Sequence, residues 1–357
     1  MKKEFKLMKG NEALAEAAIL AGCDAYFGYP ITPQSEVLEY LSTYATQRTG
    51  MVVLQAESEV ASINMVYGAA GTGKRVMTSS SSPGISLMQE GISYIACAQL
   101  PCLIVNVQRG GPGLGTIQPG QADYFQTVKG GGHGDYKLIT LAPSTVQEMV
   151  DFVDQAFELA FKYRTPVMIL ADGALGQMME KVQLPEQKER TKEIPAWATV
   201  GKPKDRERNI ITSLSLDPNV MEGVNNQLQE KYRTIEKNEI RYEMTNCEDA
   251  DYILVAFGLV ARICQKAAYL AREKGIKVGV FRPITLYPFP YEALNKLADN
   301  VKGFLDVEMN AGQMVEDVKL AVLGKKPVEF HGRMGGVIPS PEEILQKLEE
   351  KFVGELV

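Results

Sequence analysis

Few residues in this sequence could bind a metal ion. Its 357 residues include only five cysteines and two histidines, and no two cysteines are spaced as C-x-x-C. Zinc and iron-sulfur centres usually take three or four such ligands from closely spaced groups. The sequence therefore predicts no zinc or iron-sulfur centre made by this chain alone. The scattered residues are Cys23, Cys97, Cys102, Cys247, Cys264, His133 and His331.

The sequence also lacks an excess of basic residues and a long apolar run. Its formal charge is −6, whereas binding to nucleic acid calls for a basic face. No stretch approaches the roughly 20 apolar residues that span a bilayer. The first residues, MKKEFKLMKG, carry the lysines of a signal peptide, but polar residues follow before any apolar run develops. We therefore expect a cytoplasmic protein that binds neither nucleic acid nor membrane.

Length and composition favour two domains. A chain of 357 residues is long for one core, and 45% hydrophobic residues can fill two. β-rich runs alternate with helical patterns on both sides of a charged, proline-containing stretch, which predicts the α/β class with two doubly wound, mostly parallel sheets. The expected limits are 1–184 for the first domain, 185–245 for a charged linker with a polar helix, and 246–357 for a smaller second domain.

The expected elements follow from periodicity and end signals. In the first domain we expect strands near 25–28, 51–55, 75–79, 102–107, 137–142 and 166–171. Helices are expected from Asn11 to Gly22, from a Thr32 cap with Pro33 in the first turn, across Val60 to Ala70, and after Pro83-Gly84 and Ser144. The polar linker helix is expected at 218–243. The second domain should contain the strands YILVAFG, IKVGVFRP and GFLDVEM, with a helix near 260–274, two shorter ones and a last one after Pro341.

Residues 68–75, GAAGTGKR, come within one hydroxyl group of the phosphate loop G-x-x-x-x-G-K-[ST]. A phosphate loop leaves a strand and enters a helix, whereas here a helix runs into the glycines and a strand leaves them. Arg75 also stands where a hydroxyl would bind magnesium. We interpret the segment as a glycine-terminated helix and a tight turn, at the sheet edge opposite the active site. Lys74 and Arg75 are therefore expected to be dispensable for turnover.

A second glycine-rich stretch, RGGPGLGT at 109–116, follows an expected strand. It lacks the G-x-G-x-x-G spacing and no apolar helix follows it within a turn, so support for a dinucleotide site is weak. Two interpretations stay open: a flexible loop with glycine hinges, or an active-site lid.

Polar segments stand at the carboxyl ends of the expected strands, where open parallel sheets collect their ligands. Thr32 could cap a helix, and Glu59 could complement a helix dipole. The serines could cap a helix or bind an anion. Arg109 could be a solvated arginine or could grip a carboxylate through paired hydrogen bonds. The segments are YPITP (29–33), AESE (56–59), SSSSPG (79–84) and QRGG (108–111).

Taken together, four motifs resemble the α subunit of 2-oxoacid:ferredoxin oxidoreductases over nearly the whole chain. The overall length and the linker with its polar helix are most similar to the branched-chain (2-oxoisovalerate) subunit, with the 2-oxoglutarate relatives close behind. The resemblance implies a thiamine-diphosphate pyrimidine-binding domain followed by a domain similar to the transketolase C-terminal domain. The motifs are GYPITPQSEVLEYL, AESEVASINMVYGAA, TSSSSPGISLMQEGISYI and VEMNAGQM.

The resemblance implies roles for individual residues. Glu59 falls on the glutamate that contacts N1′ of the cofactor's aminopyrimidine, where an acid promotes the proton removal that activates the cofactor. Thr32 and Arg109 fall on positions expected to bind the substrate, Arg109 through the substrate carboxylate. The cofactor-binding positions implied besides Glu59 are Ser82, Pro83 and Gly84.

The chain lacks the G-D-G and distant asparagine through which thiamine enzymes bind diphosphate and Mg²⁺; its nearest approach is Ala171-Asp172-Gly173. The resemblance therefore implies a thiamine-diphosphate and Mg²⁺-binding β subunit, a γ subunit and a ferredoxin-like δ subunit that holds iron-sulfur clusters. It also implies ferredoxin, CoA and a 2-oxoacid as reaction partners, in a dimer of hetero-oligomers.

Three alternatives to a branched-chain oxidoreductase stay open. One is the 2-oxoglutarate- or pyruvate-specific member of the same family, and another is a ferredoxin-independent thiamine-diphosphate enzyme. The third is a non-catalytic scaffold or nucleotide-binding module.

Overall fold

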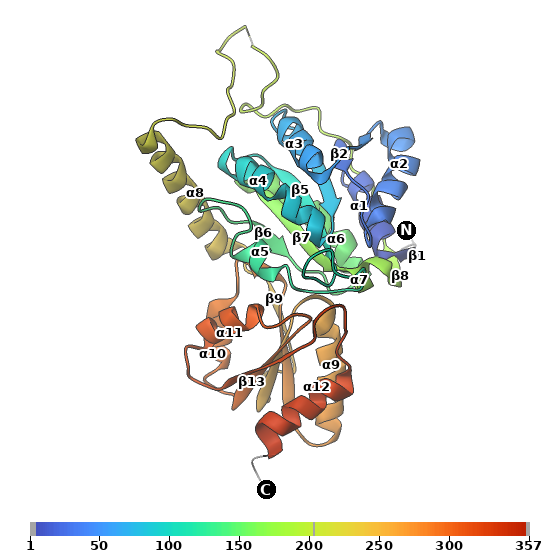
Figure 1. Ribbon diagram of the computed structural model, residues 1–357, viewed down its shortest axis with the longest axis vertical. Helices are drawn as coiled ribbons and strands as arrows, with labels where there is room; N and C mark the ends of the chain where they lie inside the picture. Colours follow the sequence, from blue (N-terminus) through green and yellow to red (C-terminus); the bar gives the residue numbers. More distant parts are fainter. Residues whose placement is uncertain (1–4, 203, 355–357) are drawn as a thin grey trace.

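The computed structural model describes residues 5–202 and 204–354. Its strands form a seven-stranded, a five-stranded and a two-stranded sheet. Figure 1 shows the seven-stranded sheet and its helices stacked on the five-stranded sheet, so that the two halves of the chain form separate layers of α/β structure. The predicted α/β class with two mostly parallel, helix-covered sheets is confirmed.

The seven-stranded sheet contains all six strands expected from the first part of the sequence. Its order is β12-β6-β7-β5-β4-β2-β3, and only β12 is antiparallel to its neighbour. The two central strands, β5 and β7, are buried along their whole length, as in other parallel sheets covered on both faces. The strands are β2 (Ala25–Gly28), β3 (Val52–Gln55), β4 (Val76–Ser80), β5 (Cys102–Gln108), β6 (Ile139–Leu141), β7 (Pro166–Asp172) and β12 (Thr285–Tyr287).

Helices cover both faces of this sheet. On one face α3 packs against α4, and on the other α1 packs against α2 and α6. Side-chain caps fix two starts: Ser58 Oγ accepts from Ala61 N before α3, and Thr145 Oγ1 accepts from Glu148 N before α6. The helices are α1 (Gly10–Leu20), α2 (Ser35–Thr49), α3 (Glu59–Ala70), α4 (Ser82–Cys97), α5 (Tyr124–Val128), α6 (Val146–Tyr163) and α7 (Gly173–Gln177).

The expected start of α2 at Thr32-Pro33 is wrong. The helix begins at Ser35, with Gln34 as the preceding residue. The Thr32 carbonyl instead accepts a hydrogen bond from Arg109 Nη1 at 3.0 Å, and the Pro33 carbonyl accepts one from Asn11 Nδ2 at 2.6 Å. These two contacts hold the segment as a connection at the strand exit, so Thr32 does not cap the helix.

The five-stranded sheet has the order β14-β13-β10-β11-β9, with only β9 antiparallel. The helices α9 and α12 pack together on one face, and α10 packs against α11 on the other. The elements are β9 (Tyr242–Thr245), β10 (Tyr252–Val255), α9 (Gly258–Glu273), β11 (Val278–Pro283), α10 (Tyr291–Leu297), β13 (Gly303–Glu308), α11 (Met314–Val322), β14 (Val328–Gly332), α12 (Pro341–Leu348) and a π-helical turn at Glu349–Val353.

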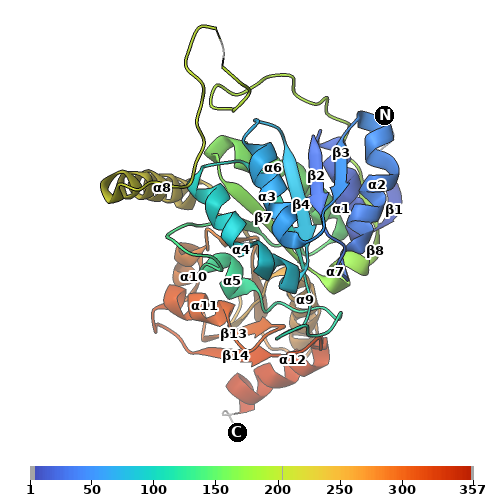
Figure 2. The same cartoon turned by 45° about the horizontal axis from the view of Figure 1, so that its top comes forward.

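The helix predicted in the linker is longer than the observed helix. α8 (Pro218–Asn238) ends five residues before the expected limit, because residues 242 and 243 belong to β9 and pair with β11. Only three α8 side chains are buried, which agrees with its polar sequence. The sequence also gave no signal for the two-stranded sheet of β1 (Phe5–Lys9) and β8 (Met179–Gln183). In Figures 1 and 2, part of the segment before α8 loops away from the body of the molecule.

A buried ion pair joins the two sheets. Arg282 of β11 contacts Glu148 of α6 through both ends of its guanidinium, at 2.6 and 2.7 Å, and their side chains are 2% and 20% exposed. Burial favours the neutral form of Glu148, but the hydrogen bonds and charge of Arg282 outweigh it, so the pKa of this carboxyl is lowered. The pair thus links stability to pH.

We predict that Arg282→Met lowers the free energy of unfolding at pH 7 by about 3 kcal/mol, because Glu148 is left buried without a cation. The double variant Arg282→Met/Glu148→Gln should recover most of this loss. Since the folded pKa of Glu148 lies below its unfolded value, the stabilisation is present above about pH 4.3 and is lost as the pH falls through the folded pKa. Thermal melts at pH 7 and pH 4 test this; equal melting temperatures for wild type and Arg282→Met at pH 7 would refute it.

Candidate active site

The polar segments singled out from the sequence converge at one edge of the seven-stranded sheet. Thr32 follows β2, Glu59 begins the helix after β3, Ser82 follows β4 and Arg109 follows β5. Because β5, β4, β2 and β3 are consecutive parallel neighbours, their carboxyl ends lie side by side. The structure therefore brings all four expected residues to the same edge.

Glu59 is a buried carboxylate that has no partner among the described residues. It is the first residue of α3 and is 6% exposed, yet no hydrogen bond or ion pair joins its side chain to the described part of the chain. Gly84 packs directly against it, because a methyl group there would lie 2.6 Å from Oε1. The helix N-terminus favours a negative charge at this position. A helix dipole alone does not require burial, so the dipole interpretation of Glu59 does not account for its position.

Two buried hydroxyls at the exit of β4 are also without partners among the described residues. Ser80 Oγ and Ser81 Oγ are fully buried and make no hydrogen bond within the described residues. Their neighbour Ser79 differs, because it donates to Gln34 Oε1 at 2.6 Å and contacts Tyr26 Oη at 2.8 Å. Leaving a buried hydroxyl unpaired costs roughly 1–3 kcal/mol. Of the two, Ser80 Oγ lies beside Glu59, because a Cβ on Gly84 would collide with both Ser80 Oγ and Glu59 Oε1.

Ser82 holds two segments of the site together. Its hydroxyl contacts Asp123 Oδ2 at 2.6 Å and accepts from the backbone N–H of Arg109 at 3.1 Å. Asn106 Nδ2 also donates to Asp123 Oδ2, at 2.8 Å. Burial raises the pKa of Asp123, and the hydrogen bonds from Ser82 and Asn106 act in the opposite direction. Sequence reasoning missed Asp123, since an aspartate after a glycine-proline loop usually indicates a solvated turn.

Arg109 is not a solvated surface arginine, because it is only 6% exposed. Its Nη1 donates to the Thr32 carbonyl at 3.0 Å and its Nη2 to the Leu114 carbonyl at 2.8 Å. Its Nε has no partner within the described residues. Thr32 is exposed beside it. The guanidinium is thus fixed in place, with one buried N–H donor left unsatisfied within the described residues.

The loop at 109–116 has a defined shape. Thr116 N donates to the Gly110 carbonyl at 2.8 Å, and Gly110 N donates to the Gln118 carbonyl at 2.8 Å. Gly113 and Gly115 both have positive φ, at +71° and +64°, which side chains other than glycine rarely adopt. The tip, Leu114, projects between them with 81% of its surface exposed.

Asp172, in the segment closest to a diphosphate motif, serves as a helix cap. Its Oδ1 accepts from Ala174 N at 2.9 Å and Leu175 N at 3.0 Å. Burial raises its pKa to about 6, against these hydrogen bonds, which lower it. Within the described residues no three His, Cys, Asp or Glu side chains gather to hold a metal ion.

Comparison with protein families identifies the family of this chain. The model described as "Pyruvate flavodoxin/ferredoxin oxidoreductase, thiamine diP-bdg" matches residues 16–246, and "Pyruvate:ferredoxin oxidoreductase core domain II" matches residues 250–344. This chain belongs to the 2-oxoacid:ferredoxin oxidoreductase family. It is an enzyme subunit of that family, and its first region is of the thiamine-diphosphate-binding type.

Individual relatives of this oxidoreductase subunit are similar over their full length. Ketoisovalerate oxidoreductase subunit VorB of Methanothermobacter marburgensis is 52% identical, over 97% of each chain. 2-Oxoglutarate synthase subunit KorA of Methanocaldococcus jannaschii is 39% identical, over 96% of this chain and 98% of the relative. No helix of the described residues is long and apolar enough to cross a membrane.

Solved structures show the same fold. The 2-oxoglutarate:ferredoxin oxidoreductase from Magnetococcus marinus, with 2-oxoglutarate, coenzyme A and succinyl-CoA bound, superposes with a TM-score of 0.84 at 27% identity. That match covers 98% of this chain and 65% of the other, so this chain spans about two thirds of its length. A split gene transketolase, an inactive β4 tetramer, shares the fold with a TM-score of 0.62 at 14% identity, over 97% of this chain and 98% of that one.

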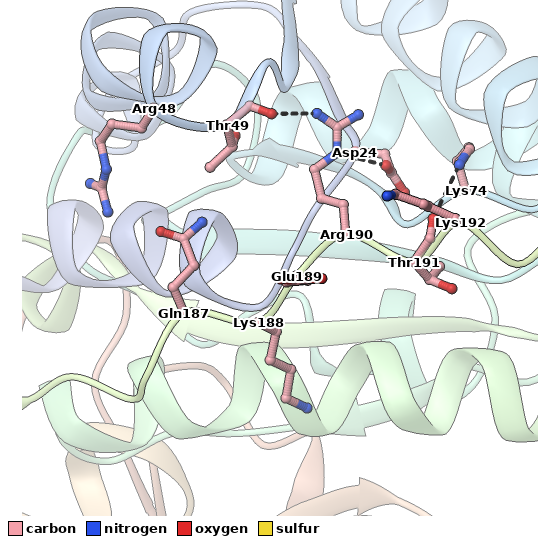
Figure 3. A pocket seen from close by; sticks show the side chains of 10 residues that line it. All are labelled: Asp24, Arg48, Thr49, Lys74, Gln187, Lys188, Glu189, Arg190, Thr191 and Lys192. Carbon is pink, nitrogen blue, oxygen red and sulfur yellow. Dashed lines mark hydrogen bonds and ion pairs between the residues drawn. The ribbon is translucent and has the colours of Figure 1, made fainter.

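The segment GAAGTGKR lies at the opposite edge of the sheet from the active-site candidates. It forms the end of α3 and the turn into β4, and Gly73 has a φ of +78°. Lys74 lines a hollow of about 560 Å³ that Figure 3 shows between this turn, α2 and the start of the linker. Arg190 crosses it and contacts Asp24 Oδ1 at 2.9 Å and the Thr49 carbonyl at 2.7 Å. The charges of this hollow fasten the linker to the sheet.

We predict that Lys74→Ala changes kcat of the assembled oxidoreductase by no more than about twofold. Within the described residues the Lys74 ammonium hydrogen-bonds only to the Thr191 carbonyl, at 3.4 Å, and it lies at the end of the strands opposite the candidate active site. Viologen reduction by wild type and variant complexes measures this. Saturable ATP binding that disappears in Lys74→Ala would instead support the nucleotide-binding alternative.

Proposed function

We propose that this chain is the subunit of a 2-oxoisovalerate:ferredoxin oxidoreductase that binds the aminopyrimidine of thiamine diphosphate. The complex would convert a branched-chain 2-oxoacid and CoA to acyl-CoA and CO₂, with electrons passing to ferredoxin. The observation that carries the proposal is the buried carboxylate of Glu59, which has no partner among the described residues and lies at the strand exits of a thiamine-diphosphate-binding family member. The 52% identity to a ketoisovalerate oxidoreductase subunit supports the choice of substrate.

The residues present fit the cofactor's ring. Glu59 offers a carboxyl oxygen, and Ser80 offers a hydroxyl beside it that has no partner among the described residues. Gly84 follows Ser82 and Pro83 in the first turn of α4, where any side chain would collide with Ser80 Oγ and Glu59 Oε1. When bound, thiamine diphosphate supplies the carbon nucleophile and accepts the electron pair that decarboxylation releases.

Within this site Glu59 holds a proton opposite N1′ of the aminopyrimidine. Glu59 stands at the N-terminus of α3 and has no hydrogen-bond partner among the described residues, so its carboxyl group is free to hydrogen-bond the ring nitrogen. The carboxyl group therefore promotes proton transfer at the ring without contacting the substrate.

Arg109 and Thr32 bind the 2-oxoacid. The free Nε of Arg109 donates to the substrate carboxylate, while the two Nη groups stay fixed on backbone carbonyls. The exposed hydroxyl of Thr32 lies next to this guanidinium and can donate to the carbonyl oxygen. Because the rotamer of Arg109 is already fixed, binding the substrate costs little additional side-chain entropy.

Other subunits complete the enzyme. We assign pyrimidine binding to residues 1–184, the charged linker to 185–245 and the transketolase C-terminal-like domain to 246–357. A β subunit holds diphosphate and Mg²⁺, and a ferredoxin-like δ subunit holds iron-sulfur clusters. With a γ subunit they form a dimer of hetero-oligomers in the cytoplasm. The absence of G-D-G and of clustered cysteines from this sequence supports this division.

The test is reconstitution with the presumed partner subunits. Viologen reduction is followed with CoA and either 2-oxoisovalerate, 2-oxoglutarate or pyruvate, and we expect the highest kcat/KM with 2-oxoisovalerate. A preference for 2-oxoglutarate would favour the second candidate, which the 39% identical relative and the Magnetococcus marinus structure support. Dye reduction that does not need CoA would contradict the proposed reaction.

A further inference from the structure

Five large apolar side chains are exposed on two loops beside the candidate active site. Two belong to the loop between β5 and α5, and three to the loop between β14 and α12. We call them the two-loop patch. Its members and their exposed fractions are Leu114 (81%), Ile117 (57%), Met334 (61%), Val337 (43%) and Ile338 (40%).

The two loops come from different halves of the chain, and glycines allow them to pack in direct contact. A Cβ on Gly110 would lie 2.7 Å from Gly336 N, and one on Gly336 would lie 3.0 Å from Thr116 Cγ2 and 2.5 Å from Gln118 Cβ. Gly336 also has a φ of +100°. In Figures 1 and 2 the segment between β5 and α5 lies against the second half of the chain in both views. The patch is therefore one surface built by two layers.

Both loops are anchored at their bases. Arg109 Nη2 holds the Leu114 carbonyl at 2.8 Å. Arg333 N donates to the Glu308 carbonyl at 3.1 Å, and its Nη1 contacts Glu343 Oε1 at 3.0 Å. An anchored apolar surface loses little conformational entropy when it is covered. These are the properties of the centre of a protein interface, where a few buried apolar anchors carry most of the affinity.

We infer that the two-loop patch is the docking surface for the partner subunit that holds the diphosphate and Mg²⁺ of the cofactor. This inference rests on the proposed function. That subunit must approach the edge where Glu59 and Arg109 lie, because the chain itself lacks the diphosphate ligands. Arg109 Nη2 donates to the Leu114 carbonyl, so the two-loop patch borders the candidate active site. A partner surface that brings the diphosphate ligands to this site therefore also covers the patch. The partner must carry a complementary apolar surface beside its diphosphate ligands.

The test measures the affinity between the full-length chain and the purified thiamine-diphosphate-binding subunit. The double variant Leu114→Asp/Met334→Asp should raise the dissociation constant by about 30-fold or more, as expected for charges placed in the core of an interface. The matched control is Leu320→Asp/Leu323→Asp, which alters two leucines of similar exposure, 58% and 69%, on and after α11. The control should bind like wild type.

Hydrogen exchange of the wild-type chain provides a second measurement that needs no variant. Adding the partner should slow exchange at residues 110–118 and 333–338, and no slowing there would overturn the inference. An unchanged dissociation constant in the double variant would also overturn the inference. This holds even if the double variant changes the KM for the oxoacid or the self-association of the chain. If the wild-type complex forms through the patch but oxidises none of the three oxoacids, the proposed function fails while the docking surface stands.

Discussion

Replacing Glu59 by glutamine should lower kcat of the reconstituted oxidoreductase by about 10²- to 10⁴-fold, the usual contribution of a positioned acid or base. Glutamine keeps the size and a hydrogen-bond acceptor, so packing against Gly84 is retained. It cannot exchange a proton with N1′ of the aminopyrimidine. Glu59→Ala should lose at least as much activity. The measurement is viologen reduction with saturating 2-oxoisovalerate, CoA and thiamine diphosphate.

The matched control is Glu57→Gln, two residues earlier and exposed to solvent. It removes the same charge from the same connection but lies outside the buried cluster, so its kcat should stay near that of wild type. Thermal melts of both variants should also match wild type, because Glu59 has no partner to lose within the described residues. If Glu59→Gln turned over as fast as wild type, the assignment of Glu59 to the cofactor ring would be wrong.

The central strands of the fold could be predicted from the sequence, and several of the peripheral ones could not. Strands such as β5 and β7 are continuous apolar runs between helices, so local pattern alone specifies them. By contrast, β12 has three residues and pairs with β6 from more than 140 positions away. The pairs β1–β8 and β9–β11 are likewise set by contacts distant in sequence, which periodicity within a window does not contain.

The sequence predicted that the candidate site residues lie at strand exits, but it did not predict their burial or the contacts they make. The positions of Glu59 and Arg109 at strand exits follow from the order of strands and helices. Their burial does not, because charged residues after strands are usually solvated. Thr32 was expected to cap a helix because Thr-Pro is a common start signal, and the tertiary contact with Arg109 overrides that signal. Asp123 emerges only when Ser82 and Asn106 are seen around it.

Replacing Arg109 by lysine should lower kcat/KM for 2-oxoisovalerate by about 10²-fold, mainly through a higher KM. Lysine keeps the charge but has no planar fork. It cannot hold the Thr32 and Leu114 carbonyls, at 3.0 and 2.8 Å, and at the same time present a donor to the substrate carboxylate. Initial rates of viologen reduction over a range of oxoacid concentrations measure this, and the KM for CoA should stay unchanged because the lost contact is with the oxoacid.

Arg48→Lys separates this effect from a general loss of stability. Arg48 also makes a forked contact with a carboxylate, that of Glu16 at 2.6 and 2.9 Å, but on α2 at the edge of the sheet away from the strand exits. Losing that fork should lower the melting temperature and leave the oxoacid KM near that of wild type. Arg109 also holds the Leu114 carbonyl, so a displaced loop is a second route by which Arg109→Lys can raise the oxoacid KM. The variant Leu114→Ala tests this route, because it keeps the carbonyl contact and removes only the side chain. An oxoacid KM that rises as much in Leu114→Ala as in Arg109→Lys would assign the role to the loop and not to the guanidinium.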